Sequence, residues 1–204
     1  MSPQGSTQAP PSRGTRDLIL DAADQFLRTH PFRDLTVSGL MQATSVSRPA
    51  FYQYFRDRYD IAAALIDRLA EAIVASGRDW LTGAASDPAG GCDAGIRSYV
   101  EHIAPQAYVM RAICDAAAAD ERIDRLWRQG LMQRYIDGVS RRIRSDQAAG
   151  SVSPALDADL TALALVLFSA SFTCDCLGKP ECASEEAFAE TVSHVWCATL
   201  YGKP

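Results

Sequence analysis

Apolar residues recur along most of this chain with the three- and four-residue spacing of amphipathic helices, and no stretch alternates convincingly as a half-buried strand does. A first helix is predicted over residues 15–28, where Leu18 and Phe26 share one apolar face. Two short helices follow within residues 36–55, and one long helix runs from residue 57 to about Trp80. The pattern predicts an all-α protein.

The remaining residues predict further helices behind a loop of Gly, Ala, Ser, Asp and Pro at residues 81–91. Helices are expected over residues 95–103, 105–119, 121–147, 155–176 and 184–201. The helix at 155–176 is apolar nearly all round, and its longest uncharged run, Leu160–Cys174, is shorter than the roughly 20 residues of a membrane span. A three-helix head would thus be joined by the long helix to a helical body, with about nine helices in all.

Composition divides the chain into three parts. Residues 1–14 are rich in Ser, Pro, Gly and Gln and are expected to form a disordered arm. Residues 15–56 form the predicted head, and residues 57–204 form the body. The first residues have no apolar segment of the secretory kind, so we expect a cytoplasmic protein that does not enter a membrane.

The two short helices predict a helix-turn-helix. Thr36 is an N-cap before the first, which ends after two turns near Ser45. Ser47 is an N-cap before the second, with Val46 and Phe51 at the spacing of a hydrophobic staple. Turning Phe51 inward leaves a polar face outward, formed by Arg48, Pro49, Tyr52 and Gln53. Side chains of these types suit contacts with phosphates and base edges.

Charge supports this interpretation only weakly. Residues 1–60 hold seven Arg and six Asp, whereas residues 61–204 hold 13 basic and 19 acidic residues, and the whole chain has a formal net charge of −5. A head with a balance of +1 must recognise DNA by geometry rather than bulk attraction. Arg141, Arg142 and Arg144 lie at the end of a predicted helix, where solvated cations complement the helix dipole.

Other chemistry is weakly represented. The six cysteines predict reduced thiols without a disulfide framework, and Cys174 or Cys182 remains an alternative as a redox switch. No metal-ligand spacing appears, so we expect no metal and no cofactor. The three histidines are scattered and no catalytic motif is present, which makes a small helical enzyme the remote alternative.

Residues 15–66 resemble the TetR-type one-component transcriptional regulators. The resemblance lies in Thr36-Val37-x-x-Leu40 to Ala43 and in Val46-Ser47-x-x-x-Phe51-Tyr52-x-Tyr54-Phe55. A similarity to the ethionamide-regulator branch lies near the C-terminus, in His194-Val195-Trp196 and Leu200-Tyr201-Gly202, and in the head, in Ser47-Arg48-Pro49. Two departures are Ser45, where the family has a turn glycine, and Arg58-Tyr59, where it has Lys-Glu.

The resemblance implies a role for each matching position of the head. Thr36, Ser47, Tyr52 and Tyr54 would hold phosphates, as would Arg58 in place of the family's lysine. Arg48, Pro49, Ala50 and Gln53 would face the groove of double-stranded DNA. The partner would be a palindromic operator, read by a homodimer joined through the last two helices, with recognition helices about 34–36 Å apart.

The resemblance also implies a small-molecule effector that binds in the body and releases a repressor from DNA. Aromatic and apolar positions are the expected lining, namely Tyr99, Ile103, Trp127, Leu131, Tyr135, Phe168, Phe172 and Trp196. Gly130 and Gly138 are expected to give room beside them. Because charged residues rarely interrupt these faces, we expect a largely apolar effector. An activator is the alternative sign of regulation.

Overall fold

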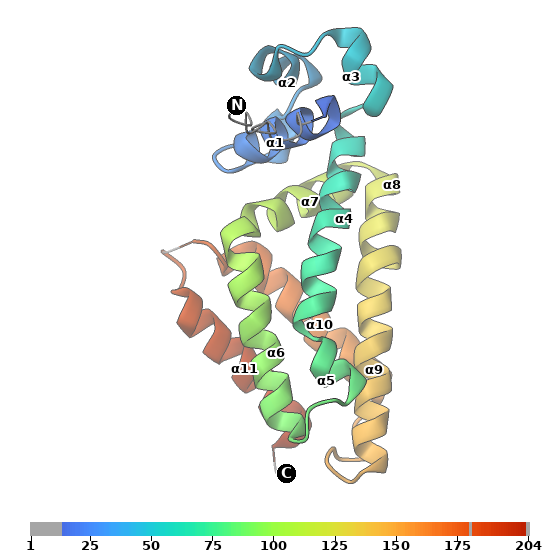
Figure 1. The fold of residues 1–204 in the computed structure, drawn as a ribbon. Helices are drawn as coiled ribbons and strands as arrows, with labels where there is room; N and C mark the ends of the chain where they lie inside the picture. Colours follow the sequence, from blue (N-terminus) through green and yellow to red (C-terminus); the bar gives the residue numbers. More distant parts are fainter. Residues whose placement is uncertain (1–13, 180, 203–204) are drawn as a thin grey trace, which may run out of the picture.

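The computed structural model describes residues 14–179 and 181–202, and these residues form helices without a strand (Figure 1). The head consists of α1 (Thr15–Leu27), the short turn η1 (Phe32–Asp34), α2 (Val37–Thr44) and α3 (Arg48–Tyr54). The predicted all-α class, with a helix-turn-helix head on a helical body, is confirmed. Most of the predicted arm, residues 1–13, lies outside the described residues.

The helix that joins head to body is shorter than predicted. α4 (Arg58–Ser76) ends at Gly77, and Trp80 belongs to a separate short helix, α5 (Arg78–Thr82). A side chain at Gly77 would lie 2.9 Å from the Tyr135 hydroxyl, and the backbones of Gly77 and Gly95 pass closely. The break turns Trp80 into the body, where its Nε1 donates a hydrogen bond to the Tyr201 hydroxyl at 2.7 Å.

The predicted loop at residues 81–91 is also partly helical. α6 (Pro88–Ile103) begins seven residues before the predicted start at residue 95. The Asp87 carboxylate accepts a hydrogen bond from the Ala89 amide at 3.1 Å, and Pro88 occupies the first helical position. The Asp87 cap and Pro88 therefore stabilise the helix start more than the two glycines in the first turn destabilise it.

The second half of the body is a long helical run followed by two apolar helices. It comprises η2 (Ala104–Gln106), α7 (Ala107–Ala119), α8 (Glu121–Asp124), η3 (Arg125–Met132), α9 (Gln133–Ala148), α10 (Ala158–Cys176) and α11 (Glu185–Tyr201). The η3 segment is a π-helix within an otherwise continuous helix, a feature frequent at functional sites. Asp157 and Ser184 cap α10 and α11.

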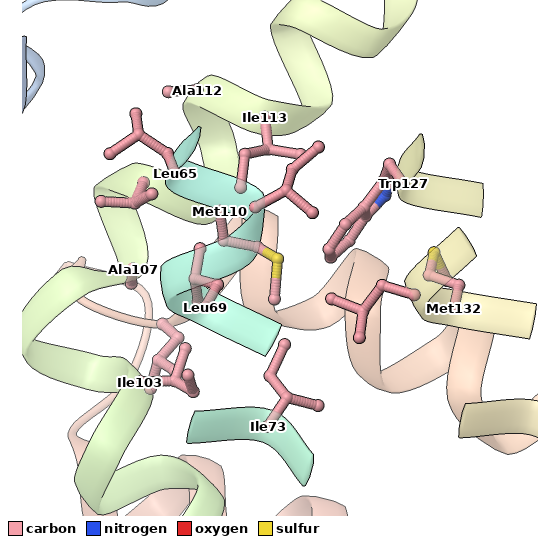
Figure 2. Close-up of a cluster of buried hydrophobic side chains, with 14 of the residues drawn as sticks. Leu65, Leu69, Ile73, Ile103, Ala107, Met110, Ala112, Ile113, Trp127 and Met132 are labelled. Carbon is pink, nitrogen blue, oxygen red and sulfur yellow. The ribbon is translucent and has the colours of Figure 1, made fainter. Parts of the chain in front are cut away.

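One core runs through the middle of the body (Figure 2). Leu65, Leu69 and Ile73 of α4 lie among side chains of α7, such as Met110, and reach towards Trp127 of η3. All five side chains are buried. α4 is therefore packed along its length, so that a change in the body core is transmitted to its orientation.

Two sequence expectations about polar groups are wrong. Arg142 is not a solvated cation, because it is buried and its Nη2 contacts Asp146 Oδ1 at 2.7 Å. The Tyr201 hydroxyl donates to Asp146 Oδ2 at 2.8 Å, so the pair belongs to a buried network. Cys176 and Cys182 form a disulfide, whereas reduced thiols were expected throughout.

α10 has a long exposed apolar face. Leu160, Leu163 and Leu167 are 64%, 38% and 41% exposed, although α10 sits in the body. By length and composition alone α10 is also apolar enough to cross a membrane, and 22% of its most apolar segment is buried. One such helix is weak evidence for a membrane span. The exposed leucines nevertheless require an explanation, because a free apolar face of this kind often marks an interface.

Candidate nucleic-acid interface and ligand pocket

Each helix of the helix-turn-helix begins at a side-chain cap. Thr36 Oγ1 accepts a hydrogen bond from the Gly39 amide at 3.1 Å, and Ser47 Oγ accepts one from the Ala50 amide at 3.4 Å. Each hydroxyl keeps its own proton for a phosphate oxygen. Ser45 lies between the helices with φ 56°, the left-handed conformation for which glycine is best suited.

α3 presents the predicted polar face to solvent. Phe51 and Phe55 are buried in the head, whereas the residues expected at DNA, namely Arg48, Pro49, Tyr52, Gln53 and Tyr54, are exposed and Ala50 is half-buried. Arg48 Nη2 donates to the Tyr52 hydroxyl at 3.3 Å, and its guanidinium lies over the Tyr52 ring. The pair presents a guanidinium and a phenol side by side, a combination able to hydrogen-bond a phosphate or a base edge.

Arg58 has a structural partner within the head. Its Nη1 donates to the carbonyls of Arg33 at 2.8 Å and Leu35 at 3.1 Å, and the guanidinium stacks over Phe32. These contacts fasten the start of α4 to the segment before α2. The predicted contact between Arg58 and a phosphate stays a prediction, since these bonds leave only part of the guanidinium free.

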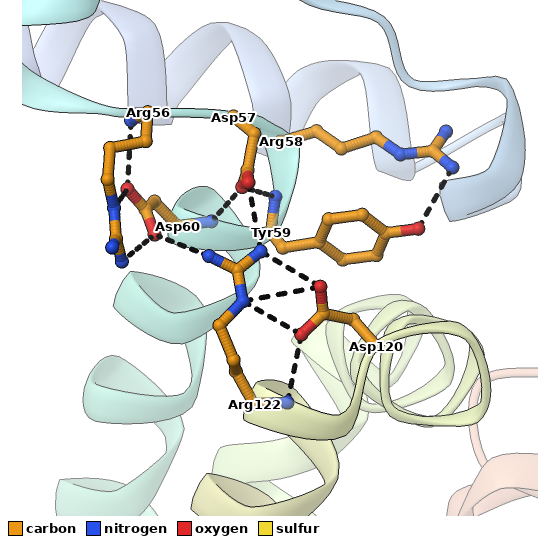
Figure 3. Close-up of polar contacts among 7 residues, drawn as sticks. All are labelled: Arg56, Asp57, Arg58, Tyr59, Asp60, Asp120 and Arg122. Carbon is orange, nitrogen blue, oxygen red and sulfur yellow. Dashed lines mark hydrogen bonds and ion pairs between the residues drawn. The ribbon is translucent and has the colours of Figure 1, made fainter.

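An ion-pair cluster that no sequence pattern predicted joins the start of α4 to α8 (Figure 3). Arg122 of α8 donates from Nη2 to Asp57 at 2.9 Å and to Asp120 at 2.8 Å, and its Nη1 lies 3.9 Å from Asp60. Asp57 Oδ1 also accepts the amides of Tyr59 and Asp60 at the start of α4. One arginine thus ties the first turn of α4, next to α3, to the body.

The cluster favours the ionised carboxylates. Hydrogen bonds from Arg56 hold the pKa of Asp60 below its usual value, and those from Arg122 do the same for Asp120. A second contact between head and body lies at α1 and α7, where the Tyr108 hydroxyl donates to Asp24 Oδ1 at 2.8 Å. The body therefore holds the head both at the start of α4 and at α1.

The body contains a pocket with about 750 Å³ of empty space, part of it open to solvent. Five of the eight predicted lining residues are present: Tyr99, Trp127, Leu131, Tyr135 and Trp196. Gly77, which ends α4, lines the pocket too, as does Ile73 one turn earlier. The helix that carries α3 at one end therefore forms part of the pocket wall at the other.

Three predicted lining residues and two glycines lie elsewhere. Ile103 is fully buried in the core, and Phe168 and Phe172 stack on each other with ring centroids 5.6 Å apart. Phe172 also stacks on Phe188, so this aromatic group holds α10 to α11. Room in the pocket wall comes from Gly77 and Gly95 rather than from Gly130 and Gly138. Helical periodicity does not reveal which apolar face borders a cavity.

The pocket contains no charged lining residue and few free polar groups. The Tyr99 hydroxyl pairs with Thr173 Oγ1 at 2.9 Å, and Trp196 Nε1 donates to Ser169 Oγ at 2.9 Å. Tyr135 makes no hydrogen bond within the described part of the chain, and burial raises its pKa to about 12. The pocket therefore offers apolar walls and one free hydroxyl.

Comparison with known proteins gives the family. The model "Bacterial regulatory proteins, tetR family" matches residues 19–65, and the model "Transcriptional regulator EthR, C-terminal domain" matches residues 92–202. The HTH-type transcriptional regulator EthR of Mycobacterium tuberculosis is 29% identical over 98% of this chain and 94% of its own length. EthR of Mycolicibacterium smegmatis is 26% identical over 98% and 93%.

Solved structures support the fold. SmeT, the repressor of a Stenotrophomonas maltophilia multidrug efflux pump, aligns with a TM-score of 0.72 at 16% identity, covering 92% of this chain and 91% of its own. Salmonella enterica GusR aligns with a TM-score of 0.71 at 18% identity, covering 96% and 99%. Among the described residues, no group of three potential metal ligands is found.

The chain belongs to the TetR family of bacterial transcriptional regulators, in the EthR-like branch, and is a DNA-binding regulator rather than an enzyme.

Proposed function

We propose that this regulator is a cytoplasmic homodimeric repressor that leaves a palindromic operator when a small apolar molecule fills the body pocket. One observation carries the proposal. α4 begins beside α3 at the Asp57 cap and ends in the pocket wall at Ile73 and Gly77. A ligand that displaces the end of α4 consequently alters the placement of α3. The ligand acts only if it binds the released state better than the DNA-binding state.

The lining narrows the class of effector. A charged ligand would lose its hydration without meeting an opposite charge, which costs several kcal/mol in an apolar site. An uncharged, mainly aliphatic or aromatic molecule with one hydrogen-bond acceptor fits, because the free Tyr135 hydroxyl can donate to that acceptor. A ketone, ester or amide oxygen has this chemistry.

Operator binding is tested with the DNA upstream of the chain's own coding region. Arg48→Ala is expected to weaken specific binding, because it removes the cation on the exposed face of α3. Tyr52→Phe should weaken it less, since only a hydroxyl is lost. The matched control is Arg33→Ala, which removes an exposed charge of the head outside α3. Equal losses in Arg48→Ala and Arg33→Ala would indicate bulk charge rather than a specific face.

The effector is sought by mass spectrometry of small molecules extracted from the purified protein. Tyr135→Phe is expected to weaken binding of the extracted compound roughly 3- to 10-fold, the effect of one hydrogen bond. Trp127→Ala should change the ligand response and leave operator affinity nearly intact. Trp127→Phe serves as a second variant, because Trp127 is buried and its truncation costs stability. Equal loss of operator and ligand binding in both variants would contradict the pocket assignment.

The sign of regulation is measured with a reporter gene placed behind the same upstream DNA. Repression is expected, because the polar face of α3 is exposed and can contact an operator that overlaps a promoter. Reporter expression should rise when the gene for this regulator is deleted. Lower reporter expression after the deletion would identify an activator instead.

A further inference from the structure

Two cysteines that neither the interface nor the pocket uses lie against each other beside the head. Cys114 of α7 and Cys174 of α10 place their sulfur atoms 2.8 Å apart. Both residues are half-buried, and each is free of a disulfide. Because a disulfide requires about 2.05 Å between its sulfurs, bond formation needs only a small further approach.

The pair is accessible to small solutes. Both cysteines line a groove of about 920 Å³, part of it open to solvent, between head and body. Its head side is formed by residues 27–32, and its body side includes Tyr108 and Arg111 of α7. A molecule the size of hydrogen peroxide can reach the sulfurs through this groove, whereas the apolar pocket described above lies elsewhere.

We propose that Cys114 and Cys174 are a redox-active dithiol, which a hydroperoxide oxidises to an intramolecular disulfide. The Cys114 thiolate attacks one peroxide oxygen, the O–O bond breaks, and hydroxide leaves and becomes water on protonation. Cys174 then attacks the resulting Cys114 sulfenic acid, the S–O bond breaks, and a second water leaves as the S–S bond forms. Two thiols are oxidised and one peroxide is reduced to two waters.

The environment of the pair assigns the two roles. When the Cys174 thiol donates the hydrogen bond between the two sulfurs, it stabilises the Cys114 thiolate and lowers the pKa of Cys114. Burial and Asp115 oppose this shift, and Arg128 acts with it. The same hydrogen bond, together with burial, raises the pKa of Cys174. Since the thiolate is the nucleophile, Cys114 attacks the oxidant and Cys174 resolves the intermediate.

The bond would form where the body supports the head. It would join α7 to α10, and α7 carries Tyr108, whose hydroxyl is bonded to Asp24 of α1. Arg28 of α1 also lies over the Tyr108 ring. A cross-link between residues 60 apart restricts the unfolded chain, so the oxidised protein should unfold at a higher temperature.

The chain supplies its own control thiols. Cys92 is almost fully buried, and burial raises its pKa. Cys197 places its thiol on the Ala89 carbonyl at 3.7 Å. Neither is expected to react with peroxide as readily as Cys114. Cys176 and Cys182 are joined in this structure. Reduction before the experiment frees both thiols, so a variant that lacks them is needed as a control.

The experiment uses the full-length protein, reduced and then exposed to increasing hydrogen peroxide in the absence of DNA. Linked peptides are mapped by mass spectrometry after cleavage before Asp175, which separates Cys174 from Cys176. The Cys176→Ser/Cys182→Ser variant gives a simpler map with four cysteines, and Cys114→Ser and Cys174→Ser are the single controls. The readout is covalent, so it does not depend on whether the proposed repression is correct.

We expect a Cys114–Cys174 linkage at the lowest effective peroxide dose. In the Cys176→Ser/Cys182→Ser variant this linkage consumes two thiols and gives a gain in Tm that dithiothreitol reverses. In Cys174→Ser, Cys114 should accumulate as sulfenic acid that a dimedone-type reagent traps. Earlier consumption of Cys92 or Cys197, or stable sulfenic acid at Cys114 in the parent chain, would overturn the proposal. Linkage of Cys174 to Cys176 or Cys182 instead of Cys114 would overturn it as well.

Discussion

Ser45 shows how one residue can carry strain at a recognition motif. It adopts φ 56° between α2 and α3, where an L-residue other than Asn or Asp costs about 1 kcal/mol or more. Ser45→Gly is therefore expected to raise the free energy of unfolding by up to about 1 kcal/mol. Urea unfolding measures the change. Ser45→Ala keeps the Cβ atom and should give no gain, so equal gains in both variants would contradict the backbone explanation.

The buried Arg142 and Asp146 pair makes a second prediction at the residue scale. Asp146→Ala leaves a buried guanidinium without its partner and removes the acceptor of the Tyr201 hydroxyl. The expected cost is about 3–5 kcal/mol of unfolding free energy. Adding Arg142→Met removes the stranded charge and should recover much of that loss. A double variant as unstable as Asp146→Ala alone would show that packing, not charge, dominates at this site.

Arg122 stabilises the packing of two helices, because it joins the start of α4 to α8 by ion pairs. Hydrogen bonds from Arg122 lower the pKa of Asp120 in the folded state, and the pKa of Asp60 is lowered mainly by Arg56, with a smaller contribution from Arg122. Their stabilisation is present above about pH 4, where the unfolded carboxylates ionise, and is lost as the pH falls through the lower folded pKa values. Thermal unfolding of the parent and of Arg122→Gln should therefore differ near pH 7 and converge at acid pH. A constant difference across pH would exclude the ionic origin.

Helix boundaries show what the sequence predicts and what it does not. Thr36, Ser47 and Asp57 are local caps, and each predicted helix start is present because a cap needs only its own neighbours. The break at Gly77 depends on Gly95 and Tyr135, which the fold brings from elsewhere in the chain. Local patterns cannot report such distant partners.

The candidate sites likewise divide into features set by local sequence and features set by distant contacts. The exposed face of α3 follows from the spacing of Phe51 and Phe55 within one short helix, and the structure places it as expected. The pocket is built from eight helical segments together with Gly77, so aromatic and apolar content predicted five of its residues but not Ile73 or Gly77. Arg122 has partners on α4 that lie more than sixty residues away, which makes it invisible to periodicity.

At the scale of the whole molecule, the proposed homodimer would account for the exposed leucines of α10. Leu160, Leu163 and Leu167 form one row on a helix that the monomer leaves half uncovered. A two-fold axis beside α10 and α11 would bury this row against its own copy in a four-helix bundle. The same symmetry would supply two α3 helices for a palindrome.

Leu163→Arg tests the dimer, because it places a charge at the centre of the row. Sedimentation velocity should show a shift from dimer to monomer, and operator binding should fall with it, since one head alone makes half the contacts. Leu126→Arg is the matched control, because Leu126 is 48% exposed but belongs to η3 rather than to α10. A dimer that survives Leu163→Arg and dissociates with Leu126→Arg would place the interface at η3 instead. Dissociation by Leu163→Arg with unchanged operator affinity would show instead that a single head suffices for binding.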